Sequence, residues 1–263
     1  MKRFLTQSIA AAALICAGSA HADVIDFENL GDQSAHAPYG YLNGTSWGGL
    51  MADGDYVTQG NYFINTQDAN NGGGLVGQWS NGSDPTSCLD GVCPTGNTTG
   101  FLSVFDDGLV HVGNNSGTSV LFSSAQVAFL KASGDAVGTT GMYMAVEADR
   151  ADGYAVWAVP VTGVGSFVNL TATAAGGLVG GQLLGSTGAS SSLTAAGVTD
   201  LFFYAYYCNP TSGSCSAFKT NKGQFAIDNI ALDVTAVPEP SQWLLMLAGL
   251  GAVGAIARRR RAV

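Results

Sequence analysis

Charged residues are scarce in this 263-residue chain, and their two signs are unevenly distributed. Charged residues make up only 11% of the sequence, with 19 acidic and 10 basic side chains. Six of the ten basic residues lie at the two ends, so the stretch from Asp23 to Glu239 holds four basic and all 19 acidic residues, a net charge of −15. Such a surface repels phosphate groups. The composition therefore argues against nucleic acid and anionic lipid as partners and favours cations or neutral glycans.

Residue types that commonly carry catalysis are also few. Only two histidines, His36 and His111, and three glutamates remain after residue 22. Ser46 lies in a G-x-S-x-G pattern, but no helix-forming pattern follows it, so a hydrolase triad of Ser46, His111 and an aspartate is not favoured. No phosphate-binding loop or metal-protease motif occurs in a sequence context that would support its function. The sequence predicts a protein that is not an enzyme, with paired acids for glycoside hydrolysis as an open alternative.

Helical periodicity is rare between residues 23 and 236, whereas short alternating apolar runs separated by Gly, Ser, Thr and Asn are frequent. This pattern predicts a single all-β domain, an antiparallel β-sandwich over residues 23–236. Asp152-Gly153 is expected to supply the turn of a hairpin. Strands are predicted at residues 24–28, 101–105, 119–122, 126–130, 142–147, 154–159, 167–172, 201–207 and 224–232.

Four cysteines follow the N-terminal apolar stretch. Cys88 and Cys93 enclose four residues, and Cys208 and Cys215 enclose six. Turn residues lie within both intervals, so local pairing is favoured among the three possible connectivities if the protein is exported. Zinc binding is not favoured, because no histidine lies near either pair.

The segment Leu201–Tyr207 is apolar on both faces of a predicted strand. Tyr204 and Tyr206 share one face, which either packs into a core or forms an aromatic platform for a sugar. Together with Trp157, these tyrosines are the candidate glycan-binding residues.

The closing strand, residues 224–232, contains a break in its alternation. Apolar residues fall at 225 and 227 and then at 230 and 232. A β-bulge at Asp228-Asn229 would return both halves to the core and redirect the Asp228 carboxylate.

The N-terminal 22 residues have the features of a secretory signal peptide. Lys2 and Arg3 precede an apolar stretch, and Ala20-His21-Ala22 is a small-residue cleavage site. We expect cleavage between Ala22 and Asp23.

The C-terminal residues 237–263 combine three elements. Pro238-Glu239-Pro240 is followed by an uncharged stretch at about 243–257 and then by Arg258, Arg259, Arg260 and Arg261. The stretch predicts a short transmembrane helix with cytoplasmic arginines. This arrangement resembles the PEP-CTERM sorting signal. The resemblance implies processing by an exosortase, a transient inner-membrane anchor with a periplasmic body, and a final place at the cell surface or in an exopolysaccharide biofilm matrix.

Two further resemblances concern the body of the chain. Gln224-Phe225 with Asp228 resembles the Gln-Phe-x-x-Asp element of a PEP-CTERM subgroup. The same strand, together with Phe27-Glu28, is similar to the closing and opening strands of jelly-roll carbohydrate-binding domains. This similarity implies a jelly-roll-like sandwich with a structural Ca²⁺ held by Glu28 and Asp228. A solvated carboxylate or a turn-capping role for Glu28 and Asp228 is the alternative.

Overall fold

The structure, a computed structural model, describes residues 22–28, 30, 49–69, 75–81, 94–130, 141–161, 165–219 and 222–233. All of them belong to one compact unit, His21–Val234. The described part contains β-strands and no α-helix. The strands are β1 (Ala22–Ile25), β2 (Gly49–Ala52), β3 (Tyr56–Gln59), β4 (Tyr62–Gln67), β5 (Leu75–Asn81), β6 (Gly100–Val104), β7 (Leu109–Asn114), β8 (Leu121–Phe129), β9 (Met142–Arg150), β10 (Gly153–Pro160), β11 (Val168–Thr171), β12 (Gln182–Ser186), β13 (Val198–Cys208), β14 (Cys215–Ala217) and β15 (Phe225–Asp233).

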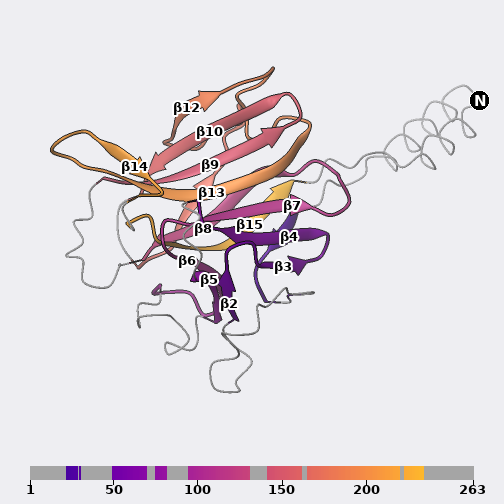
Figure 1. Ribbon diagram of the computed structural model, residues 1–263. Helices are drawn as coiled ribbons and strands as arrows, with labels where there is room; N and C mark the ends of the chain where they lie inside the picture. Colours follow the sequence, from indigo (N-terminus) through magenta and orange to yellow (C-terminus); the bar gives the residue numbers. More distant parts are fainter. Residues whose placement is uncertain are drawn as a thin grey trace, which may run out of the picture. The chain divides into compact units, whose positions relative to one another are not determined.

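These strands form two antiparallel sheets (Figure 1). The seven-stranded sheet has the order β11-β8-β15-β6-β5-β2, and β1 also pairs with β15. The eight-stranded sheet has the order β12-β10-β9-β13-β7-β4-β3. In this sheet β14 pairs with the end of β13 that β7 does not reach. The predicted all-β architecture with two antiparallel sheets is confirmed.

A hydrophobic core lies between the two sheets, and strand alternation decides which side chains enter it. In β13, Leu201, Phe203 and Ala205 belong to this core and are buried. Phe203 meets Phe122 of β8 in the other sheet, with ring centroids 5.7 Å apart. Burying a side chain of this kind stabilises the fold by roughly 1.5–3 kcal/mol. The inward face of β13 is thereby fixed, and Tyr204 lies on the opposite face.

The closing strand β15 contains the predicted bulge. Between the pairs Asp228–Gln126 and Ala231–Ser124, β15 has one residue more than β8. Asn229 lies within this bulge and has a φ of 49°, in a backbone region that asparagine tolerates better than most residues. The bulge brings both halves of the strand to the core face, where four side chains are fully buried: Phe225, Ile227, Ile230 and Leu232.

The turn between β9 and β10 is tighter than the predicted hairpin loop. Arg150 pairs directly with Gly153, which leaves only two residues in the turn. Gly153 has a φ of 155°, and a Cβ atom built on it would lie 2.5 Å from the backbone carbonyl of Thr187. The turn therefore requires glycine for close approach as well as for its backbone conformation.

Alternation predicted the later strands better than the early ones. The segments predicted at 119–122 and 126–130 form a single strand, β8, and the predicted strands do not include β2 to β5, β7, β12 or β14. Glycines and polar residues, such as Gly77 in β5 and Gly113 in β7, interrupt the apolar alternation of these strands. His111, which the sequence did not place on any element, lies on β7.

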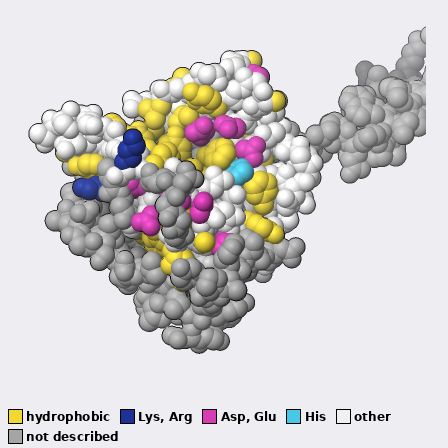
Figure 2. Space-filling model, in the orientation of Figure 1, with side chains coloured by type: hydrophobic (Ala, Val, Ile, Leu, Met, Phe, Trp, Pro, Cys, Tyr) yellow, Lys and Arg dark blue, Asp and Glu magenta, His cyan; other side chains and the backbone are white. Residues whose placement is uncertain are grey.

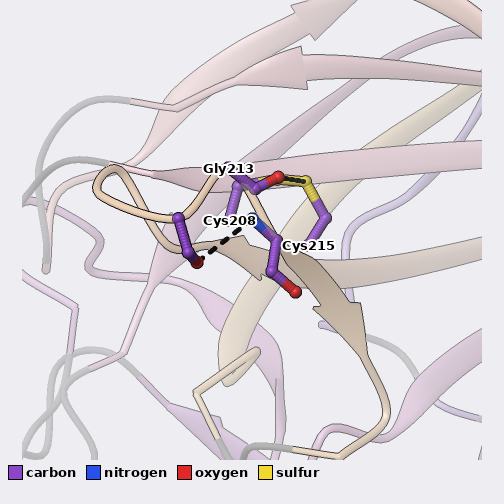
Figure 3. Close-up of a disulfide and its surroundings, with 5 residues drawn as sticks. Cys208, Gly213 and Cys215 are labelled. Carbon is purple, nitrogen blue, oxygen red and sulfur yellow. Dashed lines mark hydrogen bonds between the residues drawn. A yellow bond between two sulfur atoms is a disulfide. The ribbon is translucent and has the colours of Figure 1, made fainter.

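Cys208 and Cys215 form a disulfide that joins β13 to β14 (Figure 3). The two cysteines are directly opposed in the pairing of these strands. The predicted local pairing is thus confirmed for this pair. Cys88 and Cys93 lie outside the described residues.

Both predicted targeting segments fall almost entirely outside the described residues. Residues 1–21 and 234–263 are not described, and these include the predicted helix at about 243–257. Within the described ranges, the structure contains no helix of a length and hydrophobicity suited to crossing a membrane. The predicted cleavage point lies at the start of β1, where Ala22 pairs with Asp233 and Val24 with Ala231.

Candidate functional site

The outward face of the eight-stranded sheet places aromatic and titratable side chains side by side. Residues paired across antiparallel strands point to the same face, so the register arranges them in rows. From β10 through β9 and β13 to β7, the rows are Pro160–Tyr143–Tyr206, Ala158–Ala145–Tyr204–Leu109, Val156–Glu147–Phe202–His111 and Tyr154–Asp149–Asp200–Gly113. We call the surface formed by these four rows the tyrosine face. Figure 2 shows hydrophobic side chains gathered over it, with acidic side chains and a histidine at one side.

Tyrosine rings dominate one end of the tyrosine face. Tyr143 and Tyr206 are stacked, with ring centroids 5.1 Å apart and planes 9° apart. Tyr204 packs against Phe218 at 5.1 Å between centroids. Tyr206 is 7% exposed, whereas Tyr154 in the last row is 38% exposed. Stacked rings with this spacing stabilise each other and hold a fixed orientation.

Hydrogen-bonding groups occupy the other end. His111 Nε2 lies 2.7 Å from Asp200 Oδ1, and the imidazole ring stacks on Phe202 with centroids 4.5 Å apart. The Tyr204 hydroxyl donates to Glu147 Oε2 at 3.4 Å. Burial, followed by the charge of Glu147, raises the pKa of Tyr204. The hydroxyl therefore stays protonated and remains a donor at neutral pH.

The carboxylates of the tyrosine face are crowded. Burial and then the neighbouring charge of Asp149 raise the pKa of Glu147. Burial and then the charge of Asp200 raise the pKa of Asp149, although His111 and Arg150 act in the opposite direction. Among the described residues, Asp149 Oδ1, His111 Nδ1 and Arg150 Nη1 are buried atoms without a hydrogen-bond partner. Three carboxylates, those of Glu147, Asp149 and Asp200, stand near the one arginine, so negative charge is in excess at this end.

Two of the three candidate glycan-binding residues lie together, and the third does not. Tyr204 and Tyr206 are both on the tyrosine face. Trp157 pairs with Val146, a core residue, and it packs against the core on the opposite side of the sheet. Its indole N–H donates to the backbone carbonyl of Ser191 at 2.6 Å. Strand alternation turns Trp157 inward, away from the face of the two tyrosines, and its role in glycan binding stays a prediction.

A second polar cluster lies where β1, β6 and β15 meet, in the seven-stranded sheet. Asp228 is fully buried, and its Oδ2 accepts hydrogen bonds from Asn97 Nδ2 at 2.8 Å, Thr99 Oγ1 at 3.2 Å and Asn229 Nδ2 at 3.0 Å. Its Oδ1 accepts from the Asn229 backbone N–H at 2.6 Å. Glu28 accepts a hydrogen bond from the backbone N–H of Gly100. Both predicted calcium ligands thus hold the same segment, residues 97–100.

These contacts bear on the calcium hypothesis. Protein donors already occupy the acceptor positions of Asp228 that a cation would use. Burial raises the pKa of Asp228 to about 6, even though its hydrogen bonds to Asn97, Asn229 and Thr99 lower it. Within the part of the chain that the structure describes, no group of three or more His, Cys, Asp or Glu side chains is arranged to hold a metal ion. Calcium binding by Glu28 and Asp228 stays a prediction, and the observed geometry is that of a hydrogen-bonded structural site.

Comparison with known proteins identifies the C-terminal end of the chain. Residues 236–261 match the PEP-CTERM protein-sorting motif. The chain carries a PEP-CTERM sorting motif. The match includes Pro238-Glu239-Pro240 and the four arginines from Arg258 to Arg261, as the sequence predicts. No curated protein matches the chain.

The PEP-CTERM motif says where the protein goes. It indicates an exported protein whose membrane-anchored precursor is processed by an exosortase and destined for the cell surface. The match covers 26 of the 263 residues and none of the β-sandwich described above. The chemistry of the sandwich has to be inferred from its own residues.

Several residues of the tyrosine face were not singled out from the sequence. Tyr143, Glu147 and Asp149 occupy alternate positions of β9, and Asp200 and Phe202 occupy alternate positions of β13. Alternation could have shown that each set shares one face of its own strand. Only the strand pairing brings the two sets together, and the pairing partners are distant in the sequence.

Proposed function

We propose that the protein is a non-enzymatic surface protein that binds a glycan of the extracellular matrix through its tyrosine face. Export and exosortase processing place the sandwich outside the cytoplasm, where an exopolysaccharide is an available ligand. The resemblance of the opening and closing strands to jelly-roll carbohydrate-binding domains supports the same class of function. A role in a biofilm matrix follows from this proposal.

The observation that carries the proposal is the pairing of aromatic rings with polar groups on one outward sheet face. Sugar rings present apolar C–H faces that pack on aromatic side chains, and their hydroxyl groups need hydrogen-bond partners. The Tyr143–Tyr206 stack offers the aromatic surface. Glu147 on β9 and the His111–Asp200 pair on β7 and β13, farther along the same strands and on the neighbouring one, offer acceptors and donors.

Substitution of Tyr143 tests this proposal. Tyr143 is partly exposed, so Tyr143→Ala should leave the fold intact while reducing glycan affinity by up to about tenfold, since one aromatic contact contributes up to about 1.5 kcal/mol beyond its burial. Binding of the full chain, purified in mild detergent, would be measured on an array of neutral, amino and acidic oligosaccharides. Val24→Ala is the control, because Val24 is 47% exposed on a strand of the other sheet. Absence of binding to every glycan would overturn the proposal.

A purely structural surface protein is the second candidate. The observation in its favour is that Tyr206 is 7% exposed and belongs to a small hydrophobic cluster with Ala145, Val156 and Ala158. In that case the tyrosines stabilise the outward face and bind nothing. Deleting the sandwich while keeping the sorting motif would then weaken the matrix, although no saturable ligand would be found for the intact protein.

A further inference from the structure

We propose that the glycan recognised by the tyrosine face carries free amino groups, as a deacetylated hexosamine polymer does. This inference deepens the proposed glycan-binding function and rests on it. The inference concerns the charge of the ligand. The acidic end of the tyrosine face favours a ligand with positive charge.

Three carboxylates stand in two adjacent rows of the face. Asp149 and Asp200 are directly opposed on β9 and β13, and Glu147 lies two residues from Asp149 on the same side of β9. Cβ atoms of directly opposed residues are about 4.5–5.5 Å apart, and like charges at that spacing destabilise a sheet. Functional sites are where such unfavourable charge is commonly kept.

Few cations lie near these carboxylates among the described residues, and Arg150, whose Nη1 has no hydrogen-bond partner, is one that acts on Asp149. Arg150 is the neighbour of Asp149 on β9, but its side chain is largely buried and binds Asp152 and the carbonyl groups of Thr187 and Ser190. His111 Nε2 lies against Asp200 Oδ1, and its ring packs against Phe63 and Phe202. Lys222 lies 4.9 Å above the ring of Tyr207, whose position in β13 alternates with those of the tyrosine face. The rows that hold the carboxylates contain no lysine or arginine among the described residues.

Charge complementarity then decides between classes of glycan. A uronic-acid polymer would bring further carboxylates to this end and would be repelled. An ammonium group beside a sugar ring would form charge-assisted hydrogen bonds with the carboxylates, and tyrosine rings also attract cations. A fully acetylated or neutral glycan could use the aromatic rings but would leave the negative charge uncompensated. The amino-bearing glycan therefore fits both ends of the tyrosine face.

Proton linkage gives this inference a distinctive pH dependence. A bound ammonium favours the ionised carboxylates of Glu147 and Asp149, so protons compete with the ligand. The groups that face them are Asp200 and His111 from β13 and β7, the Tyr204 hydroxyl, Tyr154 from β10, and Arg150 from the adjacent position. Binding should weaken as the pH falls through the raised pKa values of the two carboxyls. Neutral glycans should show no such dependence.

The experiment compares three hexasaccharides on the full chain by isothermal titration calorimetry: glucosamine, N-acetylglucosamine and glucuronic acid oligomers. We expect the glucosamine hexamer to bind at least tenfold more tightly than its acetylated counterpart at low salt. Glu147→Gln and Asp200→Asn should each remove most of that preference. Asp233→Asn removes the same charge from an exposed position of the other sheet and should leave the preference unchanged.

The possible results separate the inference from the function on which it rests. Equal binding of the glucosamine and acetylated hexamers, lost in Tyr143→Ala, would overturn the amino preference and keep glycan binding. No binding of any hexamer would overturn both. Equal affinity for a hexalysine peptide, independent of Tyr143, would show that the face recognises positive charge and not a sugar, which overturns the inference.

Discussion

Asp228 in the seven-stranded sheet and Glu147 in the eight-stranded sheet are both carboxylates whose pKa is raised, first of all by burial. Their partners differ. Asp228 accepts hydrogen bonds from three residues, Asn97, Thr99 and Asn229. Glu147 accepts one long bond from Tyr204 and stands beside another carboxylate, Asp149.

The difference separates a structural carboxylate from one placed for a ligand. Where donors surround a buried carboxylate, its removal leaves several polar groups unpaired, and the fold loses stability. Where charges of one sign are crowded with few donors, removing one of them relieves repulsion. The comparison therefore predicts opposite signs for the same kind of substitution at the two sites.

The largest expected effect comes from Asp228→Ala. This change leaves the donors of Asn97, Thr99 and Asn229 without their acceptor, so we expect a loss of about 3 kcal/mol in the free energy of unfolding. Denaturant unfolding at pH 7, followed by circular dichroism, would measure it. Asp233→Ala, at the exposed end of the same strand, should cost less than about 0.5 kcal/mol. A similar loss for both variants would contradict a structural role for Asp228.

The pH dependence of stability should identify the same carboxylate. Burial raises the pKa of Asp228 from 3.8 to about 6, so the folded state binds a proton that the unfolded state releases between these values. The stabilisation from this group is complete below pH 3.8 and is lost as the pH rises through 6. Relative to Asp228→Asn, the wild type should gain about 2–3 kcal/mol between pH 7 and pH 4. If the stabilities of the wild type and Asp228→Asn changed in parallel with pH, the raised pKa of Asp228 would be ruled out. The nearby charge of Asp26 also raises this pKa.

Removing the Cys208–Cys215 disulfide tests whether the tyrosine face depends on β14, the short strand that pairs with the end of β13. Replacing Cys208 and Cys215 by serine should lower stability by about 2 kcal/mol, because the cross-link restricts the unfolded chain. Since Ala217 of β14 pairs with Tyr206, we also expect weaker glycan binding. The pH profile attributed to Asp228 should not change. Full glycan affinity in the double variant would show that β14 does not position the tyrosines.

The smallest effect, and the one of opposite sign, is expected for Glu147→Gln. The amide keeps an acceptor for the Tyr204 hydroxyl and removes repulsion with Asp149, so stability at pH 7 should rise by about 0.5 kcal/mol. Glu147 is partly exposed, and solvent screening limits the gain. Thermal melting of Glu147→Gln would check this gain. Tyr204→Phe, measured in parallel, removes the hydrogen-bond donor and keeps the charge of Glu147. A loss as large as that of Asp228→Ala would mean that the two carboxylates are equivalent.

Sequence reasoning succeeded where the cause is local. The bulge at Asp228-Asn229 was predictable because alternation is a property of neighbouring residues, and the Cys208–Cys215 pair was predictable because a short loop keeps its ends close. The sequence did not place Trp157 on either face, because its neighbours in the chain do not reveal which side of β10 meets the core.

By itself the sequence determined the destination of this protein, since a sorting motif acts through a contiguous stretch of chain and residues 236–261 contain all of it. It also determined the β class, because alternation and turn residues act over a few positions. Only the tertiary structure decided that His111, Glu147 and Asp200 share one surface with Tyr204, because β7, β9 and β13 become neighbours through long-range pairing. It also decided that Asp228 is held by Asn97 and Thr99, residues about 130 positions away, which no local pattern specifies.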